Sequence, residues 1–274
     1  MNLHDPPKAP LKLGILGITG RMGRAIHAQA QQEHPSLFYV VGGTSYQSTS
    51  TTAHLLSLDD LVPQCDVIVD FSHPDALKAH LTACLTWEKP LVMGTTGLSP
   101  QQQEQLKSVA KVTPILLASN TSLGIVLLRH LISQAIAHLQ PYDPQVDIHD
   151  IHHQHKEDAP SGTAISLAHA LLKGQGVDAA DVPWFIPTRE AGQEYTPRPP
   201  HGIGLSTQRI GECPGTHTVT MAWGQEMLTL THTAHDRNVF ANGALKAAEW
   251  LVRHSRDVGR VFSMEDVLNL KAAP

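Results

Sequence analysis

The chain has 274 residues, of which 41% are hydrophobic and 16% charged, and its formal net charge at pH 7 is −5. This length allows one large domain or two smaller ones, and the acidic balance without a Lys/Arg cluster argues against nucleic-acid binding. No apolar run of roughly 18 residues and no signal-peptide-like stretch is present, and the three cysteines form no CxxC pair. We therefore expect a cytoplasmic protein without a membrane span.

The first half of the chain alternates short apolar runs with helix-compatible segments. The apolar runs predict five strands, at 11–16, 37–41, 67–71, 91–93 and 115–118. The segments between them predict helices at 21–32, 74–87 and 100–111. Strands that alternate with helices predict βαβ units and a mainly parallel sheet covered on both faces, which is an α/β fold.

The pattern changes after residue 120. A long helix is predicted at 122–139, a strand at 145–151 and a helix at 161–172 that stops at Gly174. Residues 174–204 are rich in Gly and Pro and predict a long excursion. Alternating residues from 203 to 233, with a turn at Gly224–Gln225, predict antiparallel strands. The last helix carries an apolar stripe, which we expect to pack on the first domain (Phe240, Ala244, Ala247 and Leu251).

Three glycines, Gly17, Gly20 and Gly23, lie between the first predicted strand and the first predicted helix. Glycines here let the backbone approach a pyrophosphate, which amide groups and the positive helix end then bind. The spacing is GxxGxxG, because Thr19 takes the second glycine position of the usual GxGxxG loop. A tight turn that needs glycine only for its geometry is the alternative, but the placement favours dinucleotide binding.

The choice between NAD and NADP is usually made at the end of the second strand, by an acid or by a base. Thr44 and Ser45 stand there, and their hydroxyl groups can bind a phosphate that no carboxylate repels. Arg21 offers a positive charge nearby, so we predict NADPH or NADH with a lean towards NADPH. The segments 94–97 and 118–121 follow two further predicted strands. Their residues are equally compatible with ligand binding and with ordinary turns.

The segment 150–164, DIHHQHKEDAPSGTA, carries the most chemistry. His152, His153, His155 and Lys156 crowd the end of a predicted strand. Ser161 is a predicted N-cap that leaves the amides at 162 and 163 for an anion. Lysine offers a compact charge with three donors, and histidine can donate a proton near neutral pH, so a carboxylate site with a proton donor is predicted.

Other interpretations of this segment are a metal site, a solvated loop and a purely structural helix cap. The histidines, including His149, are close in sequence, but strand alternation distributes them over two faces. Neither an HExxH helix nor a cysteine partner accompanies them. We therefore expect no metal.

Taken together, these segments resemble the dihydrodipicolinate reductases, also called 4-hydroxy-tetrahydrodipicolinate reductases, of bacterial lysine and diaminopimelate biosynthesis. Residues 152–164 resemble the signature of that family. The blocks GITGRMGR (17–24), GTTG (94–97) and FANGA (240–244) are similar to its other blocks and follow in the same order.

The resemblance implies a Rossmann-like nucleotide-binding domain, 1–121, completed by 237–274. Between these segments it implies a second α+β domain, 122–236, with a mixed, largely antiparallel sheet that mediates a homotetramer. The implied reaction is the NAD(P)H-dependent reduction of 4-hydroxy-tetrahydrodipicolinate, a small dicarboxylate, to tetrahydrodipicolinate, with hydride transfer to C4 and loss of water.

By the same resemblance, His152 is the expected proton donor and acceptor and Lys156 a proton donor. The substrate contacts implied are His153, Gly162 and Thr163. The nucleotide contacts implied are Gly17, Ile18, Thr19, Gly20, Arg21, Met22, Thr44, Ser45, Gly94, Thr95, Thr96, Ala118, Ser119, Asn120, Thr121, Arg237 and Phe240. The sequence departs from the family in Thr44 and Ser45, which replace an acid and an arginine, and in His73, to which we assign no role.

Two other functions stay open at this point. One is a different Rossmann-type dehydrogenase, such as an amino-acid dehydrogenase. The other is a catalytically silent nucleotide sensor, against which the intact set of His152, Lys156 and residues 161–163 argues, since a sensor needs no proton donor.

Overall fold

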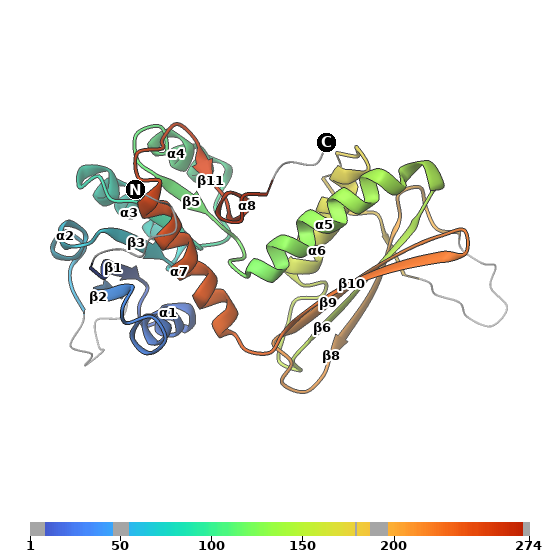
Figure 1. The fold of residues 1–274 in the computed structure, drawn as a ribbon, viewed down its shortest axis with the longest axis horizontal. Helices are drawn as coiled ribbons and strands as arrows, with labels where there is room; N and C mark the ends of the chain where they lie inside the picture. Colours follow the sequence, from blue (N-terminus) through green and yellow to red (C-terminus); the bar gives the residue numbers. More distant parts are fainter. Residues whose placement is uncertain (1–8, 46–54, 179, 187–196, 271–274) are drawn as a thin grey trace. The chain divides into compact units, whose positions relative to one another are not determined.

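The computed structural model describes residues 9–45, 55–178, 180–186 and 197–270. The chain divides into two compact units (Figure 1). The first contains Met1–Leu123 and Asn238–Asn269, and the second contains Gly124–Arg237 and Leu270–Pro274. Within the described ranges, no helix has both the length and the apolar character that a bilayer crossing requires.

The first unit is built on a six-stranded sheet with the order β11-β5-β4-β3-β1-β2, in which all neighbours are parallel. Every residue of β3 and β4 is buried, as expected for a parallel sheet with both faces covered. The predicted α/β fold is thus confirmed. The strands are β1 (Leu11–Leu16), β2 (Phe38–Thr44), β3 (Val67–Asp70), β4 (Leu91–Met93), β5 (Ile115–Leu117) and β11 (Val261–Phe262).

Helices cover this sheet, and one of them comes from the end of the chain. The helix α7 packs against α1 and against β3, β4 and β5, so its predicted return to the first domain is confirmed. Its buried face is rich in small residues, such as Ala241, Gly243 and Ala244, which allow close packing. The helices are α1 (Arg21–Gln32), α2 (Leu58–Leu61), α3 (Leu77–Thr86), α4 (Pro100–Val109), α7 (Asn238–Arg253) and α8 (Met264–Val267).

The second unit contains a five-stranded mixed sheet with the order β10-β9-β6-β8-β7. The pairs β10–β9 and β9–β6 are antiparallel, whereas β6–β8 and β8–β7 are parallel. The mixed sheet is confirmed, but its antiparallel part is limited to three strands, with the predicted turn at Gly224–Gln225. The strands are β6 (Gln145–His152), β7 (Trp184–Phe185), β8 (Ile203–Arg209), β9 (Gly215–Trp223) and β10 (Glu226–Ala234).

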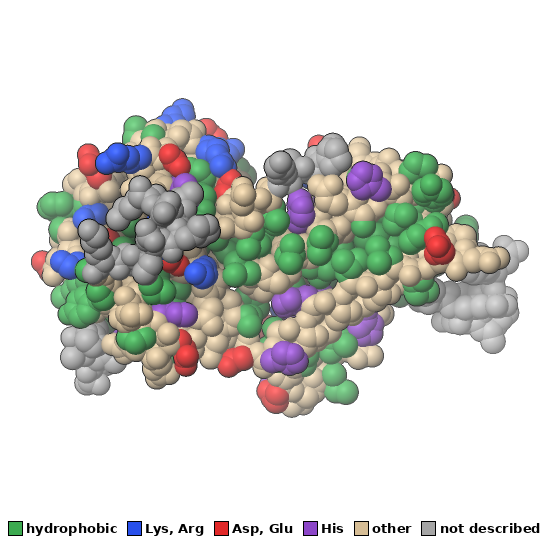
Figure 2. All heavy atoms as spheres, in the orientation of Figure 1, with side chains coloured by type: hydrophobic (Ala, Val, Ile, Leu, Met, Phe, Trp, Pro, Cys, Tyr) green, Lys and Arg blue, Asp and Glu red, His purple; other side chains and the backbone are tan. Residues whose placement is uncertain are grey.

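Two helices, α5 (Leu123–Leu139) and α6 (Gly162–Gly174), pack with this sheet around one core that includes Ile132, Leu167 and Met221. A further face of α5 is exposed and apolar, and it carries Leu127 and Leu131. Hydrophobic side chains form a green band across the second unit in Figure 2. The helix α6 ends at Gly174, where its stop was predicted, two residues beyond the predicted last helical residue. The glycine with a positive φ in this segment is Gly176, at +73°.

Candidate functional site

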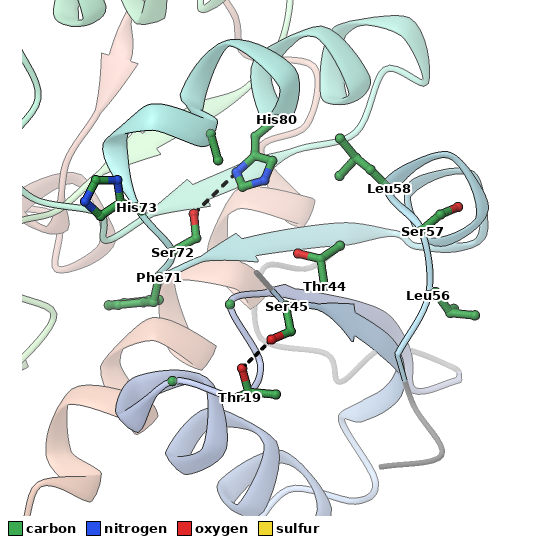
Figure 3. A pocket seen from close by; sticks show the side chains of 13 residues that line it. Thr19, Thr44, Ser45, Leu56, Ser57, Leu58, Phe71, Ser72, His73 and His80 are labelled. Atoms are coloured by element: carbon green, nitrogen blue, oxygen red, sulfur yellow. Dashed lines mark hydrogen bonds between the residues drawn. The ribbon is translucent and has the colours of Figure 1, made fainter. Parts of the chain in front are cut away.

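The first group of predicted site residues lies at the carboxyl ends of β1, β2 and β3. The strand order reverses there, since β1 lies between β2 on one side and β3 on the other. Ligands of open parallel sheets bind at such reversals, outside the carboxyl ends of the strands. A cavity of about 680 Å³ opens at this position (Figure 3).

Five of the predicted nucleotide-binding residues line the cavity: Gly17, Thr19, Gly20, Thr44 and Ser45. The hydroxyl oxygens of Thr19 and Ser45 lie 2.7 Å apart and connect the glycine loop to the end of β2. The remaining lining residues belong to the segment around α2 and to the segment that follows β3, and the sequence did not predict them (Leu56, Ser57, Leu58, Phe71, Ser72, His73, Ala76 and His80).

The backbone of the glycine loop has a conformation that can accept an anion. Gly17 has a φ of +81°, and a Cβ on it would lie 2.8 Å from the carbonyl oxygen of Phe71. The amides of Gly17 and Ile18 both donate to the carbonyl oxygen of Thr44 at 3.1 Å and so fix the end of β2. Gly20 is the N-cap of α1 and has no side chain, so the amides of the first helical turn are left for an anion. This arrangement fits the pyrophosphate of a dinucleotide.

The wall of the cavity is mostly apolar and carries little charge. Its described lining residues include no carboxylate, lysine or arginine, and the titratable side chains among them are His73 and His80. Arg21, predicted to supply positive charge, is exposed and is absent from the lining. His80 is buried, and its Nδ1 lies 2.7 Å from Oδ2 of the buried Asp70.

Asp70, the last residue of β3, ties the loops after β3 and β4 together. Its Oδ1 accepts hydrogen bonds from the amide and the hydroxyl of Ser72, at 2.9 and 2.6 Å, and from the hydroxyl of Thr95 at 3.3 Å. Thr95 is a predicted nucleotide contact. In the structure its side chain is buried and holds the loop in place.

The other predicted nucleotide contacts do not line the cavity. Thr121 Oγ1 donates to the carbonyl oxygen of Phe240 at 2.7 Å, and a Cβ on Gly243 would collide with the carbonyl oxygen of Thr121. The FANGA block therefore lets α7 approach the end of β5. The predicted nucleotide contacts outside the cavity lining lie in the glycine loop, after β4, after β5 and near the start of α7 (Ile18, Arg21, Met22, Gly94, Thr95, Thr96, Ala118, Ser119, Asn120, Thr121, Arg237 and Phe240).

The second group of predicted site residues lies in the second unit, at the end of β6 and the start of α6. Alternation along β6 places Val146, Ile148, Asp150 and His152 on its buried face. Asp150 is fully buried, and His152 is 7% exposed. A charged carboxylate at such a position requires partners, because its hydration is lost.

Four groups surround the Asp150 carboxylate. Oδ1 lies 2.8 Å from His152 Nδ1 and 3.3 Å from His217 Nε2. Oδ2 accepts hydrogen bonds from the amide of Ser161 at 2.9 Å and from Arg209 Nη2 at 3.2 Å. Burial by itself raises the pKa of Asp150, but the interactions with His152, His217 and Ser161 outweigh it and hold that pKa well below its usual value. The carboxylate is therefore ionised at neutral pH.

The start of α6 is organised as the sequence predicted. Ser161 is the N-cap, and its hydroxyl accepts from the amide of Ala164 at 3.1 Å. Gly162 is exposed, and a Cβ on it would meet no atom within 4 Å, so the space in front of the helix start is open.

Lys156 lies beside this helix start, and its Nζ contacts Oδ1 of Asp158 at 2.6 Å. That contact, helped by the amide of Gly162, holds the pKa of Asp158 below its usual value. The carboxylate of Asp158 thus binds Lys156 and the amide of Gly162, which are the groups that were predicted to bind a carboxylate of the substrate. The predicted substrate contact His153 is partly exposed, and lost hydration together with the Arg237 guanidinium lowers its pKa.

The ligand atoms of Asp150, His152 and His217 all lie within 4.8 Å of one another, which is close enough for a metal ion. Two ligands on a tetrahedral zinc ion are about 3.3 Å apart, as follows from its bond lengths. The 2.8 Å between Asp150 Oδ1 and His152 Nδ1 is shorter than that, and Arg209 already supplies positive charge. The geometry favours an ion-pair network over a metal centre.

Comparison with known families covers both units. Residues 11–121 match the family model described as dihydrodipicolinate reductase, N-terminus, and residues 124–268 match its C-terminal counterpart. The chain belongs to the dihydrodipicolinate reductase family.

Relatives in this family match over nearly the whole chain. The 4-hydroxy-tetrahydrodipicolinate reductase of Zymomonas mobilis subsp. mobilis is 37% identical over 265 residues, which cover 96% of this chain and 99% of the relative. The enzyme of that name from Sulfurimonas denitrificans is 37% identical over 265 residues, covering 95% and 100%.

Solved structures support the fold. A dipicolinate-bound dihydrodipicolinate reductase from Paenisporosarcina sp. TG-14 has a TM-score of 0.74 at 20% identity and covers 93% of this chain and 97% of that one. An apo scyllo-inositol dehydrogenase from Lactobacillus casei has a TM-score of 0.58 at 14% identity and covers 95% and 93%. The architecture is thus shared with the family and with other dehydrogenases.

Two residues that contact the family signature segment were not predicted from the sequence. Arg209 lies at the end of β8 and His217 near the start of β9, more than 50 positions along the chain from Asp150. One signal was available, because His217 alternates in phase with Val219 and Met221 on the buried face of a strand. A histidine at such a position needs a polar partner, although the sequence does not say which one.

Proposed function

We propose that this protein reduces 4-hydroxy-tetrahydrodipicolinate to tetrahydrodipicolinate with a nicotinamide nucleotide. The observation that carries the proposal is that the carboxylate of Asp158 binds both Lys156 and the start of α6. The buried His152 belongs to the same segment of the chain. A site that already binds a carboxylate and lies next to a proton donor suits a dicarboxylated imine. The family membership of the whole chain supports the same reaction.

The cavity at the end of β1 would bind the nucleotide, with the pyrophosphate at the uncapped start of α1 and the adenosine end near Thr44 and Ser45. When bound, the reduced nicotinamide supplies a hydride for C4 of the substrate. The protein's own part is to hold this group and to exclude competing reactions. A preference for NADPH is supported by the described lining of the cavity, which offers hydroxyl groups and contains no carboxylate that would repel a 2′-phosphate.

The residues of the second unit would bind and protonate the substrate. The amides of Gly162 and Thr163 and the ammonium of Lys156 would take one substrate carboxylate in place of Asp158, with His153 alongside. Reduction with loss of water consumes one hydride and one proton. His152 and Lys156 are the groups placed to deliver that proton. Fixing the substrate against these donors lowers the barrier by orientation alone.

We further propose a cytoplasmic homotetramer without nucleic-acid or membrane partners. β10 is an edge strand of the second sheet, and it exposes Met227 by 69% and Leu228 by 38%. An edge strand with exposed apolar side chains can pair between copies of the chain. The functional domains would be 1–121 with 237–274, and 122–236. The division into compact units at Leu123/Gly124 and at Arg237/Asn238 supports these boundaries.

The test is oxidation of NADPH and NADH by the purified protein in a coupled reaction that generates 4-hydroxy-tetrahydrodipicolinate. We expect turnover with both nucleotides and at least equal efficiency with NADPH. Turnover with amino acids instead would indicate an amino-acid dehydrogenase. Nucleotide binding without turnover of any substrate would indicate a nucleotide sensor.

A further inference from the structure

The buried carboxylate of Asp150 contacts both parts of the candidate substrate site, yet the proposed reaction does not use it directly. Oδ1 faces the ring of His152 at 2.8 Å, and Oδ2 accepts the amide hydrogen of Ser161 at 2.9 Å. Ser161 is the N-cap of α6, so its position determines where the first amides of that helix point. One carboxylate therefore contacts the proton donor and the carboxylate seat at the same time.

The charges around Asp150 leave it ionised and enclosed. Arg209 supplies one positive charge through Nη2, and a second guanidinium nitrogen lies 3.3 Å from the carbonyl oxygen of Asp150. Arg209 Nη2 also donates to the carbonyl oxygen of Asp158 at 2.7 Å. The guanidinium thus connects Asp150 to the loop that carries Lys156. A paired and hydrogen-bonded carboxylate can stay charged in a buried position, whereas an unpaired one cannot.

The distance between Asp150 and His152 determines which ring nitrogen carries the proton. If Nδ1 were unprotonated, two electron-rich atoms, one of them anionic, would lie 2.8 Å apart with no hydrogen between them, which is strongly unfavourable. Nδ1 therefore carries a hydrogen in the neutral ring and in the imidazolium alike. The two atoms are within hydrogen-bond distance but lack the angles that a hydrogen bond requires, so a rotation of the ring would improve the contact.

The opposite nitrogen of His152 is then the one that exchanges a proton. Nε2 lies beside Gly215, where a Cβ would come within 3.0 Å of it. The absence of a side chain at Gly215 thus keeps space next to Nε2.

His217 completes the network from the other side. Its Nε2 lies 3.3 Å from Asp150 Oδ1 and 3.2 Å from the hydroxyl oxygen of Ser161, and its ring packs edge-on against His152 with centroids 5.1 Å apart. His217 therefore contacts the carboxylate, the helix cap and the proton donor, and restricts rotation of the His152 ring.

We propose that Asp150 is a positioning residue that keeps His152 in the Nδ1–H tautomer, frees Nε2 for proton transfer and fixes the start of α6, with His217 and Arg209 holding the carboxylate in place. The role in proton transfer rests on the proposed function, whereas the tautomer is a property of the free protein. The same logic makes a buried carboxylate essential to histidines that act as general acids or bases in other enzymes.

The substitution Asp150→Asn tests this role, because the structure dictates how the amide must orient. The Ser161 amide and Arg209 both need an acceptor, so the asparagine oxygen takes the place of Oδ2. Its NH₂ group then takes the place of Oδ1 and points at His152 Nδ1. A donor there forces the hydrogen of the neutral ring to Nε2, and this nitrogen then has no lone pair with which to take up a proton.

The first measurement is the ¹⁵N NMR spectrum of the histidine rings in the free protein, with His152 assigned by comparison with His152→Gln. We expect the Nδ1–H tautomer in the wild-type protein and the Nε2–H tautomer in Asp150→Asn. An Nε2–H ring in the wild-type protein would overturn the proposal, and that result does not require any variant to fold. A stoichiometric metal ion in the wild-type protein that Asp150→Asn loses would overturn it as well.

The second measurement is the steady-state reduction of substrate. For Asp150→Asn we expect kcat to fall on the order of 10²-fold, while KM changes by less than about threefold because the Ser161 amide keeps an acceptor. A purely structural role would instead change KM and kcat together, which would overturn the proposal. The matched control is Asp147→Asn on the same strand, whose exposed carboxylate pairs with Arg198 and does not contact His152; it should leave both constants unchanged.

The two measurements separate this proposal from the proposed function. A wild-type protein with an Nδ1–H ring but no reductase activity would refute the function and support the ring assignment. An active protein with an Nε2–H ring would refute the positioning role and leave the function intact.

Discussion

Replacing Lys156 with alanine should lower turnover strongly while changing the stability of the fold only slightly. A lost acid catalyst lowers kcat by about 10²–10⁴-fold, which corresponds to about 2.7–5.4 kcal/mol of transition-state free energy. The ion pair between Lys156 and Asp158 contributes much less to folding, because Asp158 is 58% exposed and such pairs are worth about 1 kcal/mol or less. We therefore expect a large loss of turnover with a melting temperature within a few degrees of the wild type.

The assay is steady-state oxidation of NADPH with substrate generated in a coupled reaction, accompanied by nucleotide titration and thermal unfolding. The affinity for NADPH should stay within about twofold, because the nucleotide cavity is lined by residues of the first unit only. Lys173→Ala, in the exposed last turn of α6, is the matched control and should retain full turnover. Turnover of Lys156→Ala within about threefold of the wild type would remove this lysine from the mechanism.

Three further predictions concern charge in buried or enclosed positions. Thr44→Glu places a carboxylate in the nucleotide cavity and should weaken NADPH binding at least about tenfold relative to NADH, as measured by titration of both nucleotides. The lowered pKa of Asp150 stabilises the fold above its unfolded pKa of about 3.9 and ceases to do so as the pH falls towards the lower folded value. Between about pH 5 and about pH 3, urea unfolding should therefore show a smaller loss of stability in Asp150→Asn than in the wild type. Burial raises the pKa of Cys65 to about 12 and that of Cys84 also upward, so a thiol reagent should label only Cys213 in the native protein and all three cysteines after unfolding.

Each of these predictions has a control or a result that would contradict it. Tyr39→Glu introduces the same charge on the exposed side of β2, outside the cavity, and should not alter nucleotide preference. Equal pH dependence in the two proteins would mean that Asp150 is not held ionised. Rapid labelling of Cys84 in the native protein would contradict its burial.

The elements that the sequence predicted well are those whose pattern is local. The helix α1 was predicted at its observed bounds, because a glycine loop precedes it and its apolar residues repeat with helical spacing. The strand β2 runs to Thr44, three residues beyond the prediction, since Gly42 and Gly43 weaken any strand pattern. The short elements α2, α8 and β11 hold only two to four residues each, too few for a period to show.

The candidate site was predictable only in part for the same reason. His152, Lys156 and Ser161 lie within one contiguous segment, so their types and spacing could be interpreted together. Arg209 and His217 reach that segment through strand pairing, β6 with β8 and β6 with β9. The sequence cannot say which strands will be neighbours. The cavity residues after β3, such as His73, were missed in the same way, because the reversal of strand order is a property of the sheet.

We expect the start of α6 and Lys156 to bind a carboxylate of the substrate. A crystal structure of the protein with NADPH and pyridine-2,6-dicarboxylate would show whether they do. We predict one carboxylate of this mimic on the amides of Gly162 and Thr163, with Lys156 turned from Asp158 to the mimic and the nucleotide pyrophosphate at the start of α1. A mimic bound away from Lys156 and Gly162, with Asp158 still in contact with both, would show that these groups do not bind the substrate carboxylate.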